Sequence, residues 1–131
     1  MDRLFLDANV LFSASWKETS GVAELWRVEG ATLVTSAYAL AETIRNIEDG
    51  AHHARLQRLM RHVEVLPGAR PGQDLPQGVS LRAKDMPILL AAIACGATHL
   101  ITGDLRDFKS LFGKRIGGVL VLRPRDYLAR R

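Results

Sequence analysis

Five carboxylates in this chain stand at or just beyond the ends of apolar segments, where solvated charge is unusual. They are Asp7, Glu42, Asp85, Asp104 and Asp107. Like charges about 4 Å apart repel by roughly 4 kcal/mol at an effective dielectric near 20, so a fold that gathers them needs positive charge between them. Oxygen ligands without clustered Cys or His favour Mg²⁺ or Mn²⁺ over Zn²⁺. Such ions activate water and neutralise a phosphodiester during in-line displacement, which is the chemistry that this pattern predicts.

The segments that must position these acids alternate between strand and helix patterns. Apolar runs typical of buried strands occur at residues 3–7, 31–35, 63–66, 98–102 and 119–122. Helical spacing or capping residues mark 8–14, 20–28, 36–47, 52–62, 84–96 and 106–112. This alternation predicts one three-layer α/β/α domain over residues 1–131, with a central parallel sheet of four to five strands.

In such a sheet, ligands bind outside the carboxyl ends of the strands. Asp7 ends the first predicted strand, and Asp104 follows the fourth by one glycine. Asp85 opens the helix that leads into the fourth strand, and Glu42 lies on the helix after the second. The topology can therefore bring these four acids to one edge of the sheet.

Each acid also has an ordinary structural interpretation. Asp7 and Asp104 fit turn positions, Asp85 fits a helix N-cap, and Glu42 can pair with Arg45 three residues on. If all four roles were purely structural, four acids would have to reach one sheet edge by chance. This is less plausible than a single shared site.

Two further polar residues are candidates for supporting roles. Asn9 can orient Asp7 or a metal-bound water, or it can cap the first helix. Thr102 can hold Asp104 through its hydroxyl, or it can be an ordinary β-branched strand residue. The helix at 36–47 has one apolar face, formed by Ala37, Leu40, Ala41, Ile44 and Ile47.

The charge distribution favours a polyanionic substrate. The chain has 18 basic and 14 acidic residues, and residues 101–131 hold eight basic against three acidic ones. A basic body around an acidic cleft suits nucleic acid, although basic surfaces also serve solubility. The candidate nucleic-acid-binding residues are Arg82, Lys84, Arg106, Lys109, Lys114 and Arg115.

Several other classes of function lack support in the sequence. No glycine-flanked serine with a matching His and Asp order is present, nor is a glycine-rich nucleotide loop. The histidines have no partners at ligand spacing and are interpreted as surface or boundary residues. The single Cys95, the absence of a signal sequence and the short apolar stretches predict a cytoplasmic protein outside the membrane.

Four segments together resemble the PIN domain family of metal-dependent ribonucleases, which includes VapC-type toxins of toxin–antitoxin pairs. They are LFLDANVL at 4–11, TSAYALAE at 35–42, KDMPILLAA at 84–92 and HLITGD at 99–104. The closing PRDYL is also similar to the C-terminal segment of the family. The resemblance spans nearly the whole chain, and the order and spacing of the segments are more specific than any one of them.

The resemblance implies that Asp7, Glu42, Asp85 and Asp104 form a catalytic quartet that uses Mg²⁺ or Mn²⁺, with Asp7, Asp85, Asp104 and Asp107 as metal ligands. Asn9 and Thr102 match supporting positions. Many relatives carry a further acid two positions after the last quartet member, whereas Asp107 stands three positions on, so it is either an accessory ligand or a helix cap. The resemblance further implies an RNA substrate, a cognate antitoxin and possible homodimers. The apolar residues Trp16, Val22, Leu25 and Trp26 can serve either antitoxin docking or core packing.

Two other functions compete with the nuclease. A Mg²⁺-binding phosphotransfer or receiver-like domain also gathers acids at a sheet edge, but it needs an acceptor Asp after the third strand, where ProGly stands. A non-catalytic RNA-binding PIN module is the other alternative, and an intact acidic quartet argues against it.

Overall fold

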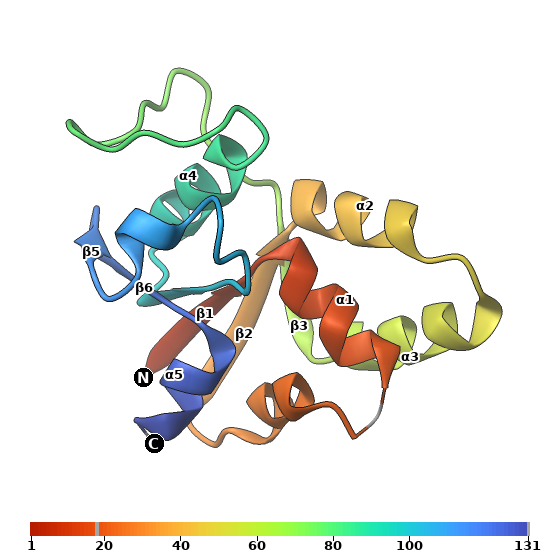
Figure 1. The fold of residues 1–131 in the computed structure, drawn as a ribbon. Coiled ribbons are helices and arrows are strands. Elements are labelled where there is room, and N and C mark those ends of the chain that lie inside the picture. The colour runs from red at the N-terminus through yellow and green to blue at the C-terminus, as the bar shows by residue number, and fades with distance from the viewer. Residues whose placement is uncertain (18, 131) are drawn as a thin grey trace.

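The computed structural model describes residues 1–17 and 19–130, and its centre is a six-stranded sheet in the order β3-β2-β1-β4-β6-β5 (Figure 1). The strands are β1 (Asp2–Leu6), β2 (Ala31–Ser36), β3 (Val63–Leu66), β4 (His99–Ile101), β5 (Arg115–Ile116) and β6 (Val119–Leu122). The first five of that order run parallel, while the two-residue β5 pairs antiparallel with β6. The parallel sheet is therefore confirmed, with one strand more than expected.

Helices cover both faces of the sheet. They are α1 (Ala8–Trp16), α2 (Ala37–Asn46), α3 (Gly50–Met60), α4 (Met86–Ala94) and α5 (Pro124–Ala129), with 3₁₀ helices η1 (Gly21–Arg27) and η2 (Lys109–Leu111). In the part of the chain that the structure describes, none of the helices has the length and apolarity needed to cross a membrane. The result is the three-layer arrangement that strand and helix alternation predicts.

The side-chain alternation of β1 divides the core into two layers. Leu4 and Leu6 pack on one face with α1, η1, α3 and α5, while Phe5 packs on the other with α4. Successive strand residues point to opposite faces, so one five-residue strand supplies both layers. All three side chains are fully buried. Strand β1 thus fixes the position of Asp7, which directly follows it, deep within the molecule.

Local helix geometry differs from the expectation in two places. The predicted helix at 20–28 is the 3₁₀ helix η1, and the predicted helix at 106–112 is reduced to η2, with turns before it. Ser36 caps α2 as its position predicts, because its Oγ accepts the N–H of Ala39 at 3.1 Å.

The predicted apolar face of α2 is divided: Leu40 and Ile47 pack in the core, while its other members face outward. Ala37 and Ala41 are exposed and Ile44 is 44% exposed, whereas Ala39 and Thr43 are buried. The Thr43 hydroxyl donates to the carbonyl of Ala39 within the helix, and it also lies 3.3 Å from the Ala8 carbonyl of α1. Small residues let the two helices approach closely, so the side with Ala39 and Thr43 packs inward together with Leu40 and Ile47.

A buried hydroxyl on β2 holds the end of β1, and its removal is expected to destabilise the fold. Thr35 Oγ1 donates to the carbonyl of Leu6 at 2.7 Å, next to Asp7. Thr35→Val keeps the shape but leaves that carbonyl without this donor, so the free energy of unfolding should fall by about 1–3 kcal/mol in urea titration. Thr32→Val on the same strand, which is half-buried, is the matched control and should change it by less than about 0.5 kcal/mol. Equal effects of the two substitutions would contradict this role.

Candidate functional site

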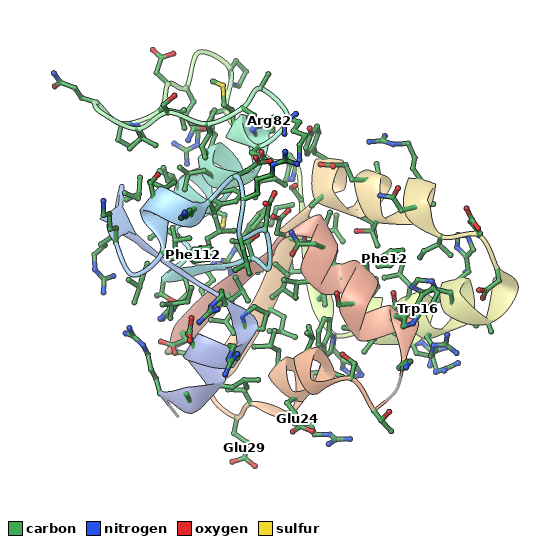
Figure 2. The ribbon with its side chains drawn as sticks, in the orientation of Figure 1. Phe12, Trp16, Glu24, Glu29, Arg82 and Phe112 are labelled. Atoms are coloured by element: carbon green, nitrogen blue, oxygen red, sulfur yellow. The ribbon has the colours of Figure 1, made fainter. Side chains whose placement is uncertain are left out.

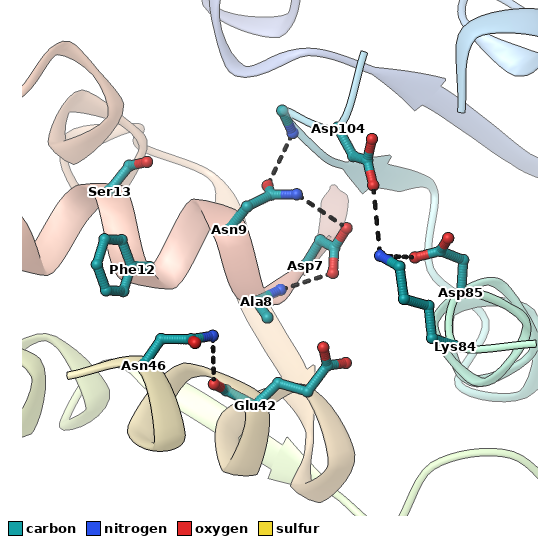
Figure 3. A pocket seen from close by; sticks show the side chains of 11 residues that line it. Asp7, Ala8, Asn9, Phe12, Ser13, Glu42, Asn46, Lys84, Asp85 and Asp104 are labelled. Atoms are coloured by element: carbon teal, nitrogen blue, oxygen red, sulfur yellow. Dashed lines mark hydrogen bonds and ion pairs between the residues drawn. The ribbon is translucent and has the colours of Figure 1, made fainter. Parts of the chain in front are cut away.

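The carboxyl edge of the sheet opens into a cleft of about 630 Å³ (Figure 3). It is lined by Asp7, Ala8, Asn9, Phe12, Ser13, Glu42, Asn46, Lys84, Asp85, Gly103 and Asp104. All four members of the predicted quartet are therefore brought to one cavity from four separate segments. Their catalytic assignment stays a prediction.

Asp7 is a deeply buried acid of the cleft. Its residue is 5% exposed, and its Oδ1 accepts the N–H of Ala8 at 2.7 Å, which caps α1. Its Oδ2 accepts from Thr102 Oγ1 at 2.8 Å and from Asn9 Nδ2 at 3.3 Å. Burial raises the pKa of Asp7 from 3.8 to about 6, against the opposing effect of these hydrogen bonds, because an ion is poorly solvated there.

Asn9 and Thr102 join the first helix to the fourth strand. Asn9 Oδ1 accepts the N–H of Gly103 at 2.8 Å, while its amide nitrogen donates to Asp7. Thr102 Oγ1 accepts the N–H of Asp104 at 3.1 Å and donates to Asp7. Thr102 therefore contacts the backbone of Asp104 and the carboxylate of Asp7, rather than the Asp104 carboxylate. Asn9 orients Asp7, and the capping of α1 falls to Asp7 itself.

The turn after β4 brings Asp107 into the site. Asp104 Oδ1 accepts the N–H groups of Arg106 and Asp107, at 3.1 and 2.9 Å. The chain folds back on itself here, so an acid three positions after Asp104 lies beside it. Oxygens of Asp85, Asp104 and Asp107 all fall within 4.8 Å of one another. Asp7 and Glu42 line the cleft outside this group of three.

Asp85 has one buried carboxylate oxygen that lacks a hydrogen-bond partner in the described residues. It is the N-cap residue of α4, as its sequence position predicts, but its side chain makes no capping hydrogen bond. The residue is 5% exposed, and its Oδ2 has no hydrogen-bond partner within residues 1–17 and 19–130. A buried carboxylate oxygen of this kind is costly unless a proton or a cation lies against it.

Two basic side chains counter the acidic group. Lys84 Nζ lies 3.4 Å from Asp85 Oδ1, 3.2 Å from Asp107 Oδ2 and 3.9 Å from Asp104 Oδ2. Arg82, labelled in Figure 2, reaches Asp107 alone, at 3.6 Å. Three carboxylates thus share two cations. Burial and the neighbouring Asp107 carboxylate raise the pKa of Asp85, whereas the contacts with Asp85 and Lys84 lower the pKa of Asp107.

Glu42 extends from α2 into the cleft, which Lys84 also lines (Figure 3). Its backbone carbonyl accepts from Asn46 Nδ2 at 3.0 Å. Its negative charge contributes to the raised pKa of Asp7, after burial. Glu42 is thus electrostatically coupled to Asp7.

The predicted RNA-binding residues separate into two groups. Lys84 lines the cleft and Arg82 touches its acids, whereas Arg106, Lys109, Lys114 and Arg115 are exposed on the segment that follows β4. Sequence reasoning assigned Lys84 to RNA and missed its contacts with the acids. Only its position next to Asp85 could have signalled them.

His52 also differs from its expected place. It is 1% exposed, and its Nε2 lies 2.7 Å from the hydroxyl of the fully buried Ser15, which joins α3 to α1. The expectation of a surface or boundary residue is wrong for this histidine. Its apolar neighbours Phe12 and Trp16 pack against the ring at centroid distances of 4.7 and 5.2 Å.

The fold is shared with solved toxin–antitoxin structures and is the expected PIN-like α/β/α fold. A chain in the crystal structure of VapBC2 from Rickettsia felis bound to a promoter DNA fragment superposes with a TM-score of 0.64 at 17% identity, over 92% of this chain and 98% of that one. A chain of VapBC-1 from nontypeable Haemophilus influenzae gives 0.62 at 18% identity, over 94% and 98%. No family model matches the chain, and neither does any curated protein sequence.

The raised pKa of Asp7 makes a prediction about stability in the presence of a chelator. A folded-state pKa above the unfolded value means that the folded protein holds the extra proton between about pH 4 and 6, so the free energy of unfolding falls as pH rises through this range. Asp7→Asn keeps an acceptor for Ala8 and removes the buried charge. Because the titrating group is lost, the fall in the free energy of unfolding between pH 4 and pH 7 should be smaller in the variant than in the wild type by about 1–3 kcal/mol, as measured by urea unfolding.

The exposed Asp74 provides the control, because Asp74→Asn should leave the pH dependence unchanged. An Asp7→Asn variant with the same pH dependence of stability as the wild type would contradict the buried-charge interpretation.

Proposed function

We propose that this protein is a Mg²⁺- or Mn²⁺-dependent endoribonuclease that acts in the cytoplasm as the toxin of a toxin–antitoxin pair. The observation that carries this proposal is the buried Asp85 oxygen without a partner in the described chain, beside two further carboxylates within 4.8 Å. This arrangement fits a hard divalent cation, because carboxylate oxygens are the ligands such ions prefer. The shared fold with VapBC structures supports the same class.

The residues of the cleft can divide the work of phosphodiester hydrolysis. Asp85, Asp104 and Asp107 would hold the cation, which when bound supplies charge neutralisation and an acidified water. Asp7 is fixed by Thr102 and Ala8 at the base of the cleft and would complete the coordination or orient a water. Glu42, outside the group of three, would accept the proton of the attacking water at its carboxylate.

Basic residues around the cleft would hold the RNA. Arg106, Lys109 and Lys114 are exposed on the chain segment that follows Asp104. Phosphate contacts of this kind position a substrate without reading its sequence. The six candidate residues therefore support binding to RNA in general.

An apolar surface on α1 and α2 supports an antitoxin partner. Trp16 is 51% exposed, Ile44 44% and Tyr38 37%, and a groove beside Trp16 is lined by Phe12, Ser13, Trp16, Lys17 and Ser20 (Figure 2). Leu25 is core and Trp26 Nε1 donates to the Leu59 carbonyl, so the docking surface that we propose excludes them. Exposed large apolar side chains on neighbouring helices are typical of interaction sites.

The strand order of the fold is a further argument against the receiver-like alternative. Its acceptor Asp would follow a central strand, but β3 is at the edge of the sheet and is followed by Pro67. The acids instead gather at β1, β4 and the start of α4.

Replacement of the acids should abolish RNA cleavage. Asp85→Asn and Asp7→Asn each remove one carboxylate charge with little change of shape, so Mn²⁺-dependent cleavage of total RNA should fall by a factor on the order of 10² or more. Asp74→Asn, on an exposed loop, should cleave like the wild type. Sequencing of RNA ends after induction would reveal the target. Full activity in the Asp7→Asn, Asp85→Asn double variant would exclude this site.

The antitoxin prediction is tested with the short reading frame adjacent to this gene. Co-expression of its product should give a complex in which RNA cleavage is inhibited. Trp16→Ala should weaken the complex by about tenfold or more, because half-exposed tryptophans are frequent hot spots. Val65→Ala, which trims an exposed apolar residue on the edge strand β3, should not. The same affinity for both variants would place the partner elsewhere.

A further inference from the structure

The Lys84 side chain lies among the acids of the cleft, at the position where a cation is needed (Figure 3). Its Nζ contacts Asp85, Asp107 and Asp104 at 3.4, 3.2 and 3.9 Å, so one ammonium group touches all three members of the acidic group. A divalent ion held by the same three carboxylates would have to occupy the same space. Two cations in contact with the same oxygens would also repel each other strongly.

The backbone of Lys84 is anchored while its side chain is not enclosed. The Lys84 carbonyl accepts from the Tyr38 hydroxyl at 2.8 Å, which ties the loop before α4 to α2. The side chain is 51% exposed, whereas those of Asp85 and Asp107 are 7% exposed. A long, flexible lysine at the mouth of the cleft can leave the acids without any backbone movement, but the acids cannot follow it.

Arg82 differs from Lys84 in this respect. Its guanidinium contacts Asp107 alone, at 3.6 Å, and its side chain is 61% exposed. It lies at the rim of the acidic group and can remain there when a cation binds. The two basic residues of this loop therefore have separate roles, although they carry the same charge.

We infer that the Lys84 ammonium is a counter-ion of the acidic group in the metal-free protein. A divalent ion competes with Lys84 for these carboxylates and displaces its side chain when it binds. This inference rests on the proposed function, because it assumes that a divalent ion binds these carboxylates. It changes the role of Lys84 from RNA contact to a residue that sets metal affinity. Without Lys84 the acids would bind the ion more tightly, and the protein without metal would be less stable.

The test is Mn²⁺ binding to the full chain, measured by isothermal titration calorimetry without RNA. Lys84→Met keeps the apolar stem and removes the competing charge, so its Mn²⁺ dissociation constant should fall by about tenfold. Lys84→Arg keeps the charge and should retain weak, wild-type-like binding. Thermal unfolding in a chelator should show a lower melting temperature for Lys84→Met, and Mn²⁺ should raise it by more than it raises that of the wild type.

Two matched controls separate competition from general electrostatics. Arg82→Met loses the same charge from the same loop but contacts one acid, so its Mn²⁺ affinity should rise by much less than that of Lys84→Met. Lys17→Met, just beyond the far end of α1 from Asp7, should leave the affinity unchanged. An equal gain in Arg82→Met and Lys84→Met would overturn the inference in favour of a diffuse charge effect.

The remaining outcomes distinguish this inference from the proposed function. Mn²⁺ binding that is lost in Asp85→Asn but is no tighter in Lys84→Met overturns the role of Lys84 and leaves the metal site standing. Binding too weak to detect in wild type and Lys84→Met alike overturns both. A tighter complex with Lys84→Met that still requires Asp85 supports the competition.

Discussion

Repulsion between carboxylates at the sheet edge is the constraint on which the rest of the site depends. Asp85, Asp104 and Asp107 approach within 4.8 Å, and the first and last of these have side chains that are only 7% exposed. Ionised groups so placed are unstable without hydrogen bonds or cations. Backbone N–H groups satisfy Asp104, while Lys84 and Arg82 neutralise part of the remaining charge. None of these contacts involves Oδ2 of Asp85, which has no hydrogen-bond partner in the described residues.

The scaffold around Asp7 is built differently, because hydrogen bonds replace cations there. Asp7 is buried beside Thr102, Asn9 and the first N–H of α1, and all of these follow directly from β1 and β4. Because β1 and β4 are adjacent parallel strands, their backbone pairing alone places the residues that follow them side by side. One wall of the cleft is therefore rigid and hydrogen-bonded, and the other, at Lys84, is ionic and adaptable. A site that takes up and releases a cation needs both properties.

The parts that the sequence could predict are those that depend on strand ends. Asp7 and Asp104 stand immediately beyond apolar runs, so the parallel topology alone brings them together. The role of Lys84 was not predictable, because it depends on which way a loop side chain turns. Nor was the buried His52, whose partner Ser15 is 37 residues away. The inward face of α2 was predicted only in part. Leu40 and Ile47 pack in the core as expected. Ala39 and Thr43 are buried as well, because small side chains let α2 approach α1 closely.

The exposed apolar residues of α2 and α1 are the part of the fold on which the proposed partner surface depends. Fully burying a side chain such as Ile44 contributes roughly 1.5–3 kcal/mol, and Ile44, at 44% exposure, loses somewhat less than half of this in the isolated chain. Trp16 on the neighbouring helix α1 is 51% exposed and also lacks part of its burial energy. Its ring stacks on Phe12 at a centroid distance of 5.8 Å, which covers one of its faces. Both positions lie on the helices that border the acidic cleft, since Phe12 and Ser13 line the cleft and the groove beside Trp16 alike. A protein that covered this surface would therefore lie directly beside the acids, and binding and inhibition would follow from a single contact.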